Sequence, residues 1–197
     1  MADLDFHRMP PWTETLEPGL YGAITVADPV LVTHLKTMSS VSVIARRGAA
    51  VPDIVGLAVP ATGRWVENED IRIASDGPDQ WRVVSESFDE GALYKAVKAA
   101  AGSSASVIDQ SHGWVTIQVS GEMMPDVLAK GTSLDTHLDA FGVGQCAATQ
   151  IAHMMVHVTC LDDHGPTYVF QMFRSMADSF GGWLRDSAAP YGVRIGS

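Results

Sequence analysis

The sequence predicts an α+β fold made of two ferredoxin-like β-α-β-β-α repeats packed together, with an extended N-terminal arm. Runs of alternating β-branched residues indicate strands, and apolar stripes at helical spacing indicate helices. The same order of turn, strand and helix start occurs twice, because Gly77 precedes Ser87 by ten residues and Gly165 precedes Ser175 by ten residues. A chance similarity between two hairpin-plus-helix segments is the alternative explanation.

The composition limits the function classes. A net charge of −10 argues against nucleic acid or an anionic membrane surface as the main partner. No apolar run approaches the roughly 20 residues of a membrane span, and the first residues lack the pattern of a signal peptide. Cys146 and Cys160 are too few for a disulfide scaffold, so we expect reduced thiols and a cytoplasmic location.

The pattern of residues 1–29 predicts an extended arm rather than a helix or strand. Four prolines interrupt the stretch, and no helical or strand period is sustained. A disordered arm is one interpretation, but disordered segments are usually poor in aromatic residues. The other interpretation is an arm that fixes Phe6, Trp12 and Tyr21 on its own body or on a partner.

Residues 30–104 predict the first repeat. Strands are expected over residues 30–35, 40–46, 67–75 and 81–86. A short helix is expected over residues 49–59, ending near Pro60. Ser87 and Glu90 have the spacing of a capping box, and the apolar stripe that follows predicts a helix ended by Gly102.

Residues 105–197 predict the second repeat, with an inserted loop over residues 131–146. Extended chain is expected over residues 106–111 and 113–121, a helix over 122–131, one long strand over 146–161, and a return strand over 168–174. Ser175 with Asp178 repeats the helix start, and the stripe after it ends at Ala188. Packing the two repeats together would cover the sheet face that each leaves open.

Three groups of residues are candidates for chemistry. Cys146, His153, His157 and Cys160 are zinc-ligand types within 15 residues, but two histidines four residues apart on one strand lie about 13 Å apart and cannot share an ion. Asp109, Ser111 and His112 are adjacent in sequence, which favours a turn over a catalytic triad.

The third group is Arg174 and Ser175, at the predicted start of the last helix, where an anion or a simple cap would fit. No glycine-rich phosphate loop is present. The residues thus predict no active site, no metal site and no cofactor bound by this chain, which favours an accessory subunit over an enzyme.

Four segments resemble the γ subunit of heterotetrameric sarcosine oxidase. They are GPDQW, DQSHGWVTIQVSG, VLAKGTSLDTHLDAFGVGQCAATQIAH and FRSMADSFGGWL. The resemblance extends from about residue 40 to about residue 192 and is most specific in the block that contains the inserted loop.

The resemblance implies a fold similar to the folate-binding aminomethyltransferase (T-protein) of the glycine cleavage system. It implies a complex with α, β and δ subunits that oxidatively demethylates sarcosine or a related N-methyl amino acid. The products would be the amine, formaldehyde or methylene-tetrahydrofolate, and hydrogen peroxide. FAD, FMN, NAD, zinc and tetrahydrofolate would belong to the partner subunits, and no catalytic residue transfers to this chain.

Two functions are therefore expected, in this order. The first is a non-catalytic subunit whose partner interface includes Phe6, Trp12 and Tyr21 of the arm with Leu138 and Phe141 of the inserted loop. A loop that folds back on its own domain is the alternative for the last two residues. The second function is a stand-alone folate-binding, aminomethyltransferase-like protein.

Overall fold

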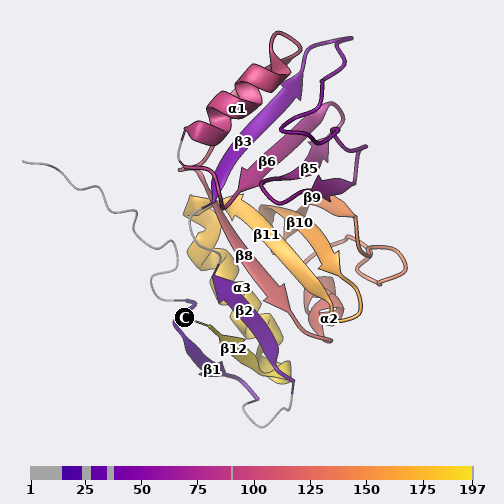
Figure 1. Ribbon diagram of the computed structural model, residues 1–197. Coiled ribbons are helices and arrows are strands. Elements are labelled where there is room, and N and C mark those ends of the chain that lie inside the picture. Colours follow the sequence, from indigo (N-terminus) through magenta and orange to yellow (C-terminus); the bar gives the residue numbers. More distant parts are fainter. Residues whose placement is uncertain (1–14, 24–27, 35–37, 90, 197) are drawn as a thin grey trace, which may run out of the picture.

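The computed structural model describes residues 15–23, 28–34, 38–89 and 91–196. They form a five-stranded and a seven-stranded sheet, each covered by helices on one face (Figure 1). The predicted α+β class is confirmed. In the described part of the chain, no helix combines the length and the apolar character that crossing a membrane requires.

The five-stranded sheet is antiparallel throughout. Its strands, in spatial order, are β4 (Trp65–Glu67), β5 (Arg72–Gly77), β6 (Gln80–Ser85), β3 (Ser39–Ala45) and β7 (Ala105–Asp109). Helix α1 (Ala92–Ala101) covers one face, and its buried residues Leu93 and Val97 join the core formed by the strands. These two positions lie one turn apart on the apolar stripe that predicted the helix.

The seven-stranded sheet contains one parallel pair, β12 with β2. Its strands, in spatial order, are β1 (Gly19–Tyr21), β12 (Val193–Ile195), β2 (Val30–His34), β8 (Trp114–Ser120), β11 (Thr167–Phe173), β10 (Met154–Asp162) and β9 (Cys146–Ile151). The short helix α2 (Met124–Ala129) and the helix α3 (Ala177–Ala188) cover one face. The 3₁₀ turns η1 (Arg174–Met176) and η2 (Ala189–Tyr191) flank α3.

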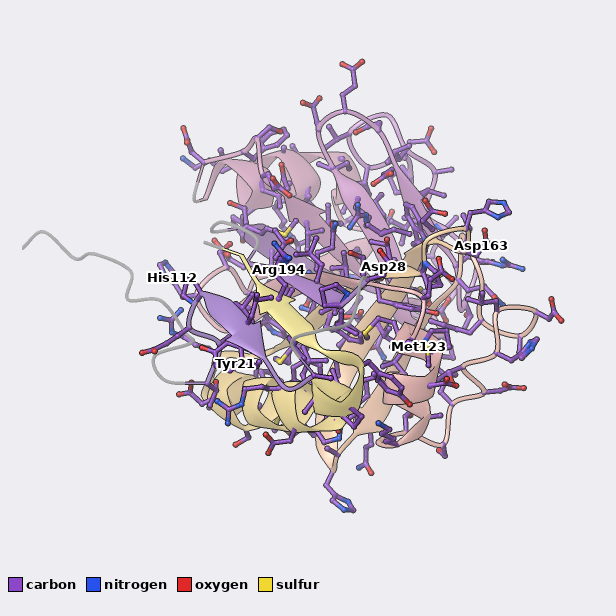
Figure 2. The ribbon with its side chains drawn as sticks, turned by 90° about the horizontal axis from the view of Figure 1, so that it is seen from below. Tyr21, Asp28, His112, Met123, Asp163 and Arg194 are labelled. Atoms are coloured by element: carbon purple, nitrogen blue, oxygen red, sulfur yellow. The ribbon has the colours of Figure 1, made fainter. Side chains whose placement is uncertain are left out.

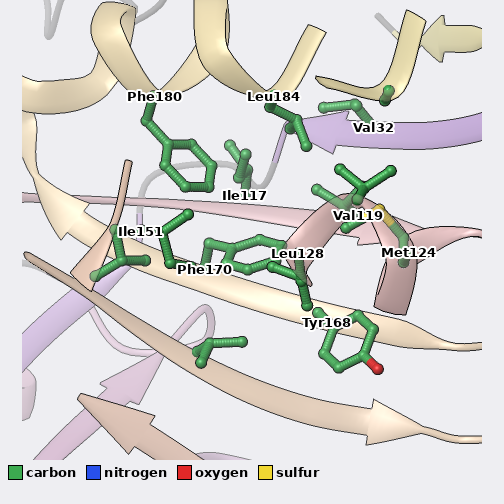
Figure 3. Packing of buried hydrophobic residues seen from close by; sticks show 14 of the residues in the cluster. Val32, Ile117, Val119, Met124, Leu128, Ile151, Tyr168, Phe170, Phe180 and Leu184 are labelled. Carbon is green, nitrogen blue, oxygen red and sulfur yellow. The ribbon is translucent and has the colours of Figure 1, made fainter. Parts of the chain in front are cut away.

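The larger core lies between this sheet and its two helices. Phe180 and Leu184 of α3 point down onto Ile117 and Phe170 of the strands (Figure 3). The rings of Phe170 and Phe180 are 5.4 Å apart, and both side chains are fully buried. Burial of aromatic side chains of this size is the main source of stability for such a layer.

The two sheets share a strand order. The five-stranded sheet contains the order β5, β6, β3, β7. The seven-stranded sheet contains the corresponding order β10, β11, β8, β12, except that β2 lies between β8 and β12. The expected boundary between residues 104 and 105 does not separate the two sheets. Strand β7 comes after this boundary but belongs to the five-stranded sheet, and β2 comes before it but belongs to the seven-stranded sheet. A division of the chain into two repeats stays a prediction.

The helix predicted over residues 49–59 is wrong. Ile54 and Leu57 instead exchange backbone hydrogen bonds of 2.8 and 3.0 Å around a tight turn. Val55 and Gly56 occupy the turn with φ values of 48° and 79°, which a right-handed helix does not allow. The segment is irregular because it buries only Ile54 fully and so has no continuous apolar stripe to pack.

The single strand predicted over residues 146–161 is also wrong. The chain reverses at Ala152 and His153, whose φ values are 49° and 67°, and the two halves pair as β9 and β10. Such a turn is usually marked by asparagine or glycine, and neither is present at these two positions, so no turn residue marked the reversal.

The predicted capping boxes do not form. Helix α1 begins at Ala92 after Gly91, whose φ is 76°, and no side chain caps it. Ser87 Oγ instead donates to the backbone oxygen of Asp70 at 3.2 Å, and Glu90 lies outside the described residues. Ser175 lies within η1 rather than before α3, whose start likewise has no side-chain cap.

The described part of the arm packs on the body of the chain. Leu16 is buried in the larger core, and Thr15 Oγ1 donates to Asp178 Oδ1 of α3 at 3.2 Å. A β-carbon at Gly181 would lie 2.6 Å from Thr15 Oγ1, so the glycine permits this close approach. Phe6 and Trp12 lie outside the described residues.

Candidate functional site

The zinc-type residues do not form a metal site. Among the described residues, no three histidine, cysteine, aspartate or glutamate side chains are grouped to hold an ion. His153 lies in the β9–β10 turn, whereas His157 lies on β10. Burial raises the pKa of Cys146 and of Cys160 to about 11, which keeps both thiols protonated at neutral pH and disfavours thiolate chemistry.

Ser111 has a structural role in a turn. Its Oγ donates to Asp109 Oδ1 at 2.7 Å and accepts a hydrogen bond from Ser40 N at 3.0 Å. Because the hydroxyl is buried and engaged on both sides, it is not available as a nucleophile.

Arg174 and Ser175 stand after β11, as the first two residues of η1. The backbone N–H of Arg174 donates to Gly113 O at 2.8 Å, which ties η1 to the turn before β8. Ser175 is exposed. An anion contact at this pair stays a prediction, since a three-residue 3₁₀ turn does not supply the aligned N–H groups of a longer helix.

Four side chains meet at the seam between the two sheets; sequence reasoning missed three of them and named His157 only as a zinc-type residue. Asp76 and Arg82 come from β5 and β6, and Trp114 and His157 come from β8 and β10. Arg82 Nη2 donates to Asp76 Oδ2 at 2.8 Å, and the guanidinium lies 3.5 Å from the centre of the Trp114 ring. We call these four residues the seam cluster.

His157 completes the seam cluster from the opposite sheet. Its Nδ1 lies 2.8 Å from Asp76 Oδ1, in the geometry of an ion pair rather than of a straight hydrogen bond. Its ring meets Trp114 edge-on, with centroids 5.0 Å apart. The Asp76 carboxylate therefore contacts one cationic or ionisable group from each sheet.

The seam cluster is buried, which decides what it can do. Arg82 is 3% exposed, and burial lowers the pKa of its guanidinium while Asp76 opposes that effect. Its Nε and Nη1 have no hydrogen-bond partner among the described residues. Loss of its one carboxylate partner would leave the buried Arg82 charge uncompensated, which is strongly destabilising. Because Asp76 and Arg82 also contact His157 and Trp114, the seam cluster holds the two sheets together.

Backbone contacts extend the seam beyond the cluster. Arg64 pairs with Gln145 in an isolated bridge, and Cys146 N donates to Gly63 O at 3.0 Å. Trp65 Nε1 donates to Cys160 O, also at 3.0 Å. The sequence carried one weak signal of this seam: Arg82 is a charge in the middle of an apolar strand, on the face away from α1.

The predicted interface residues have different fates. Phe141 is buried and stacks on Tyr168, so the inserted loop folds back on its own domain there. Leu138 is half-buried. Tyr21 is half-buried against the larger core, and its hydroxyl donates to Glu17 O at 2.9 Å. Large exposed apolar side chains occur instead at Leu20, Leu31, Ile44, Ile108, Val143, Met155 and Phe173.

The seam and most strands of the two sheets fall within a single family match, whereas β1, β2 and β12 lie outside it. The model of the sarcosine oxidase gamma subunit family matches residues 43–190, about three quarters of the chain. The chain belongs to the sarcosine oxidase gamma subunit family. The predicted resemblance is thereby confirmed, and the matched range contains all four residues of the seam cluster.

Solved structures extend the comparison to the fold. A chain of the heterotetrameric sarcosine oxidase from Corynebacterium sp. U-96, in complex with pyrrole 2-carboxylate, is similar with a TM-score of 0.74 and 21% identity. The similarity covers 82% of this gamma-family chain and 85% of that chain. A search of curated protein sequences finds no match.

The glycine cleavage system aminomethyltransferase T from Bartonella henselae is also similar, with a TM-score of 0.58 and 14% identity. The similarity covers 79% of this chain but only 45% of that one. The chain thus spans less than half of that aminomethyltransferase, and the similarity in fold is what the sequence resemblance implied.

Proposed function

We propose that the chain is the non-catalytic gamma subunit of a heterotetrameric, flavin-dependent oxidase. The complex would demethylate sarcosine or a related N-methyl amino acid to the amine, with formaldehyde or methylene-tetrahydrofolate and hydrogen peroxide as further products. The family match over residues 43–190 is the observation that carries this proposal. The partners would be the α, β and δ subunits.

The chemistry of the chain's own residues agrees with an accessory role. The described residues offer no cluster of metal ligands for the zinc of such a complex. The one buried cation in the seam, Arg82, is engaged by Asp76 within the chain rather than facing a ligand. On the family match, the proposal assigns FAD, FMN, NAD, zinc and tetrahydrofolate to the partner subunits and derives no catalytic step through this chain.

Co-purification tests the proposal. The full chain is expressed with an affinity tag, alone and together with the polypeptides encoded beside it in its native genome. We expect the chain alone to show no flavin absorbance and no amine oxidation, and the co-expressed chain to elute with a yellow, sarcosine-oxidising complex. Turnover of sarcosine by the isolated chain, or elution free of any flavoprotein, would contradict it.

The structural similarity to aminomethyltransferase T supports a second candidate function, a stand-alone folate-binding, aminomethyltransferase-like protein. This candidate requires that the isolated chain bind tetrahydrofolate. A calorimetric titration decides between the two functions, because stoichiometric binding to the isolated chain favours the second and no detectable heat favours the first.

A further inference from the structure

Three neighbouring strands at one end of the seven-stranded sheet present an apolar row interrupted by a cation. Leu20 of β1 lies opposite Arg194 of β12, and Arg194 lies opposite Leu31 of β2. Leu20 is 50% exposed, Leu31 is 39% exposed, and Arg194 is exposed between them. We call these three residues the edge row.

The edge row faces away from the helices. Tyr21 and Val193, the neighbours of Leu20 and Arg194 along their strands, pack toward the larger core, so by strand alternation the edge row points to the opposite face. Figure 2 shows this arrangement, with Tyr21 directed toward α3 and Arg194 directed away from it. The five-stranded sheet covers the same face farther along, at the seam, but leaves the edge row open.

The Arg194 side chain has no ion pair, hydrogen bond or ring contact with any residue in the described part of the chain. Other arginines of the chain are engaged: Arg72 binds Glu67, Arg82 binds Asp76, and Arg185 contacts Thr15. The chain has a net charge of −10 with 23 acidic residues, yet no carboxylate among the described residues forms an ion pair with the Arg194 side chain.

A shallow hollow adjoins the edge row. Its lining residues are Leu20, Tyr21, Ala23, Pro29, Gly192, Val193 and Arg194. Both polar and apolar atoms line the hollow, and Arg194 contributes to its wall beside the exposed Leu20. An arginine flanked by apolar surface is the usual form of a hot spot in protein interfaces, where the planar donors bind a carboxylate and the surroundings exclude water.

We propose that the edge row and its hollow form the docking surface for another subunit of the oxidase complex, one that presents a surface carboxylate flanked by apolar side chains. Charge complementarity selects this partner, since an apolar surface alone would leave the guanidinium desolvated and unpaired. The inference rests on the proposed function, because it requires a complex to which the chain belongs.

The experiment measures the affinity of the full-length, purified chain for the remaining subunits of the complex by biolayer interferometry. The test variants are Arg194→Glu, Arg194→Lys and the pair Leu20→Asp with Leu31→Asp. A matched surface on the other sheet supplies the controls, Arg46→Glu and the pair Ile44→Asp with Ile108→Asp, because Ile44 and Ile108 are exposed to a similar degree. Circular dichroism first confirms that every variant is folded.

We expect Arg194→Glu and the leucine pair to weaken binding by about tenfold or more, Arg194→Lys to weaken it less, and the controls to change it by less than about threefold. The inference is overturned when the wild-type chain binds and Arg194→Glu binds equally well, or when only the isoleucine pair weakens binding. Failure of the wild-type chain to bind any of the subunits overturns the proposed function instead, so the two failures are distinguishable.

Discussion

The two sheets share a strand order but differ in the segment that follows the strand of that order that comes first in the sequence, which is β8 in one sheet and β3 in the other. In the seven-stranded sheet, β8 leads into α2, which buries Met124, Val127 and Leu128. In the five-stranded sheet, β3 leads into an irregular segment that buries only Ile54 and Pro60 before β4 begins. Among the described residues the larger core contains 23 buried apolar side chains and the smaller core 12, so the smaller one has much less hydrophobic free energy to offset chain entropy.

We call the five-stranded sheet with α1 the smaller unit and the seven-stranded sheet with α2 and α3 the larger unit. The difference in core size explains why the two units are joined by the seam cluster as well as by backbone hydrogen bonds. A unit with one helix and a short apolar core is marginal by itself. Its open face meets the larger sheet through the seam cluster, where Asp76 and Arg82 are paired within the smaller unit and contact His157 and Trp114 across the seam. We infer that the two units unfold together.

Truncating one core residue in each unit tests this inference and has the largest expected effects. We expect Phe180→Ala to cost about 3–5 kcal/mol and Leu93→Ala about 2–5 kcal/mol, because both side chains are fully buried. Urea denaturation of the full chain, followed by tryptophan fluorescence and by far-ultraviolet circular dichroism, should give a single coincident transition for each variant. Two separated transitions in Leu93→Ala would show that the units are independent.

Removing the carboxylate of the seam cluster should cost nearly as much. We expect Asp76→Ala to lower the free energy of unfolding by about 3–5 kcal/mol, because it leaves the buried Arg82 guanidinium uncompensated. The double variant Asp76→Leu with Arg82→Met removes both charges and serves as the matched control. Its loss should be smaller than that of Asp76→Ala alone; an equal or larger loss would mean that packing, not charge, holds the seam.

The sequence predicted the regular parts of both units and missed what depends on contacts between them. The stripe that ends at Ala101 and the one that contains Phe180 marked α1 and α3, since each follows a helical period. The reversal at Ala152 had no turn residue to mark it. Arg82 gave a weak signal of the seam cluster, but its contacts could not be predicted because Asp76 and His157 are 81 positions apart and meet only in the folded chain.

Phe141 was predicted to lie in the partner interface, but the fold buries it in the chain's own core. Phe141 is a large apolar residue in an inserted loop, which suggested exposure, but it stacks on Tyr168 at a centroid distance of 6.3 Å and fills the end of the larger core. Exposure depends on which face of a strand or loop the fold leaves open. Leu20 and Leu31 became candidates only when the strand pairs placed them on either side of Arg194.

The two buried thiols, Cys146 at the seam and Cys160 in the larger core, should make the folding stability fall at high pH. Burial raises the pKa of both from 9.0 to about 11, so the unfolded chain loses these protons at a lower pH than the folded chain. Stability from the thiols is therefore complete below about pH 9 and is lost as the pH rises through about 11, by roughly 2 kcal/mol per thiol at the upper value. Burial also raises the pKa of Tyr168, which acts in the same direction at still higher pH.

Urea denaturation at pH 8, 9.5 and 11 of the wild-type chain and of Cys146→Ala, Cys160→Ala and the double variant measures this loss. Each single variant should show a shallower decline than the wild type. The Sγ of Cys146 donates to Arg64 O of the smaller unit at 3.1 Å, whereas Cys160 is buried within the larger core. A double variant that declines as steeply as the wild type would exclude the thiols as the cause.

The smallest expected effects come from two of the tight turns, one in each unit, that hold non-glycine residues in left-handed conformations. Ala152→Asn with His153→Gly supplies the residues that such a hairpin turn favours and should raise stability by about 1 kcal/mol, or roughly 2–4 °C in Tm. Val55→Asn relieves a comparable strain at φ 48°, but Val55 is half-buried against the smaller core and loses apolar contact on replacement. Its gain should therefore be smaller, and calorimetry of the two variants would contradict this ranking if Val55→Asn were the more stabilising.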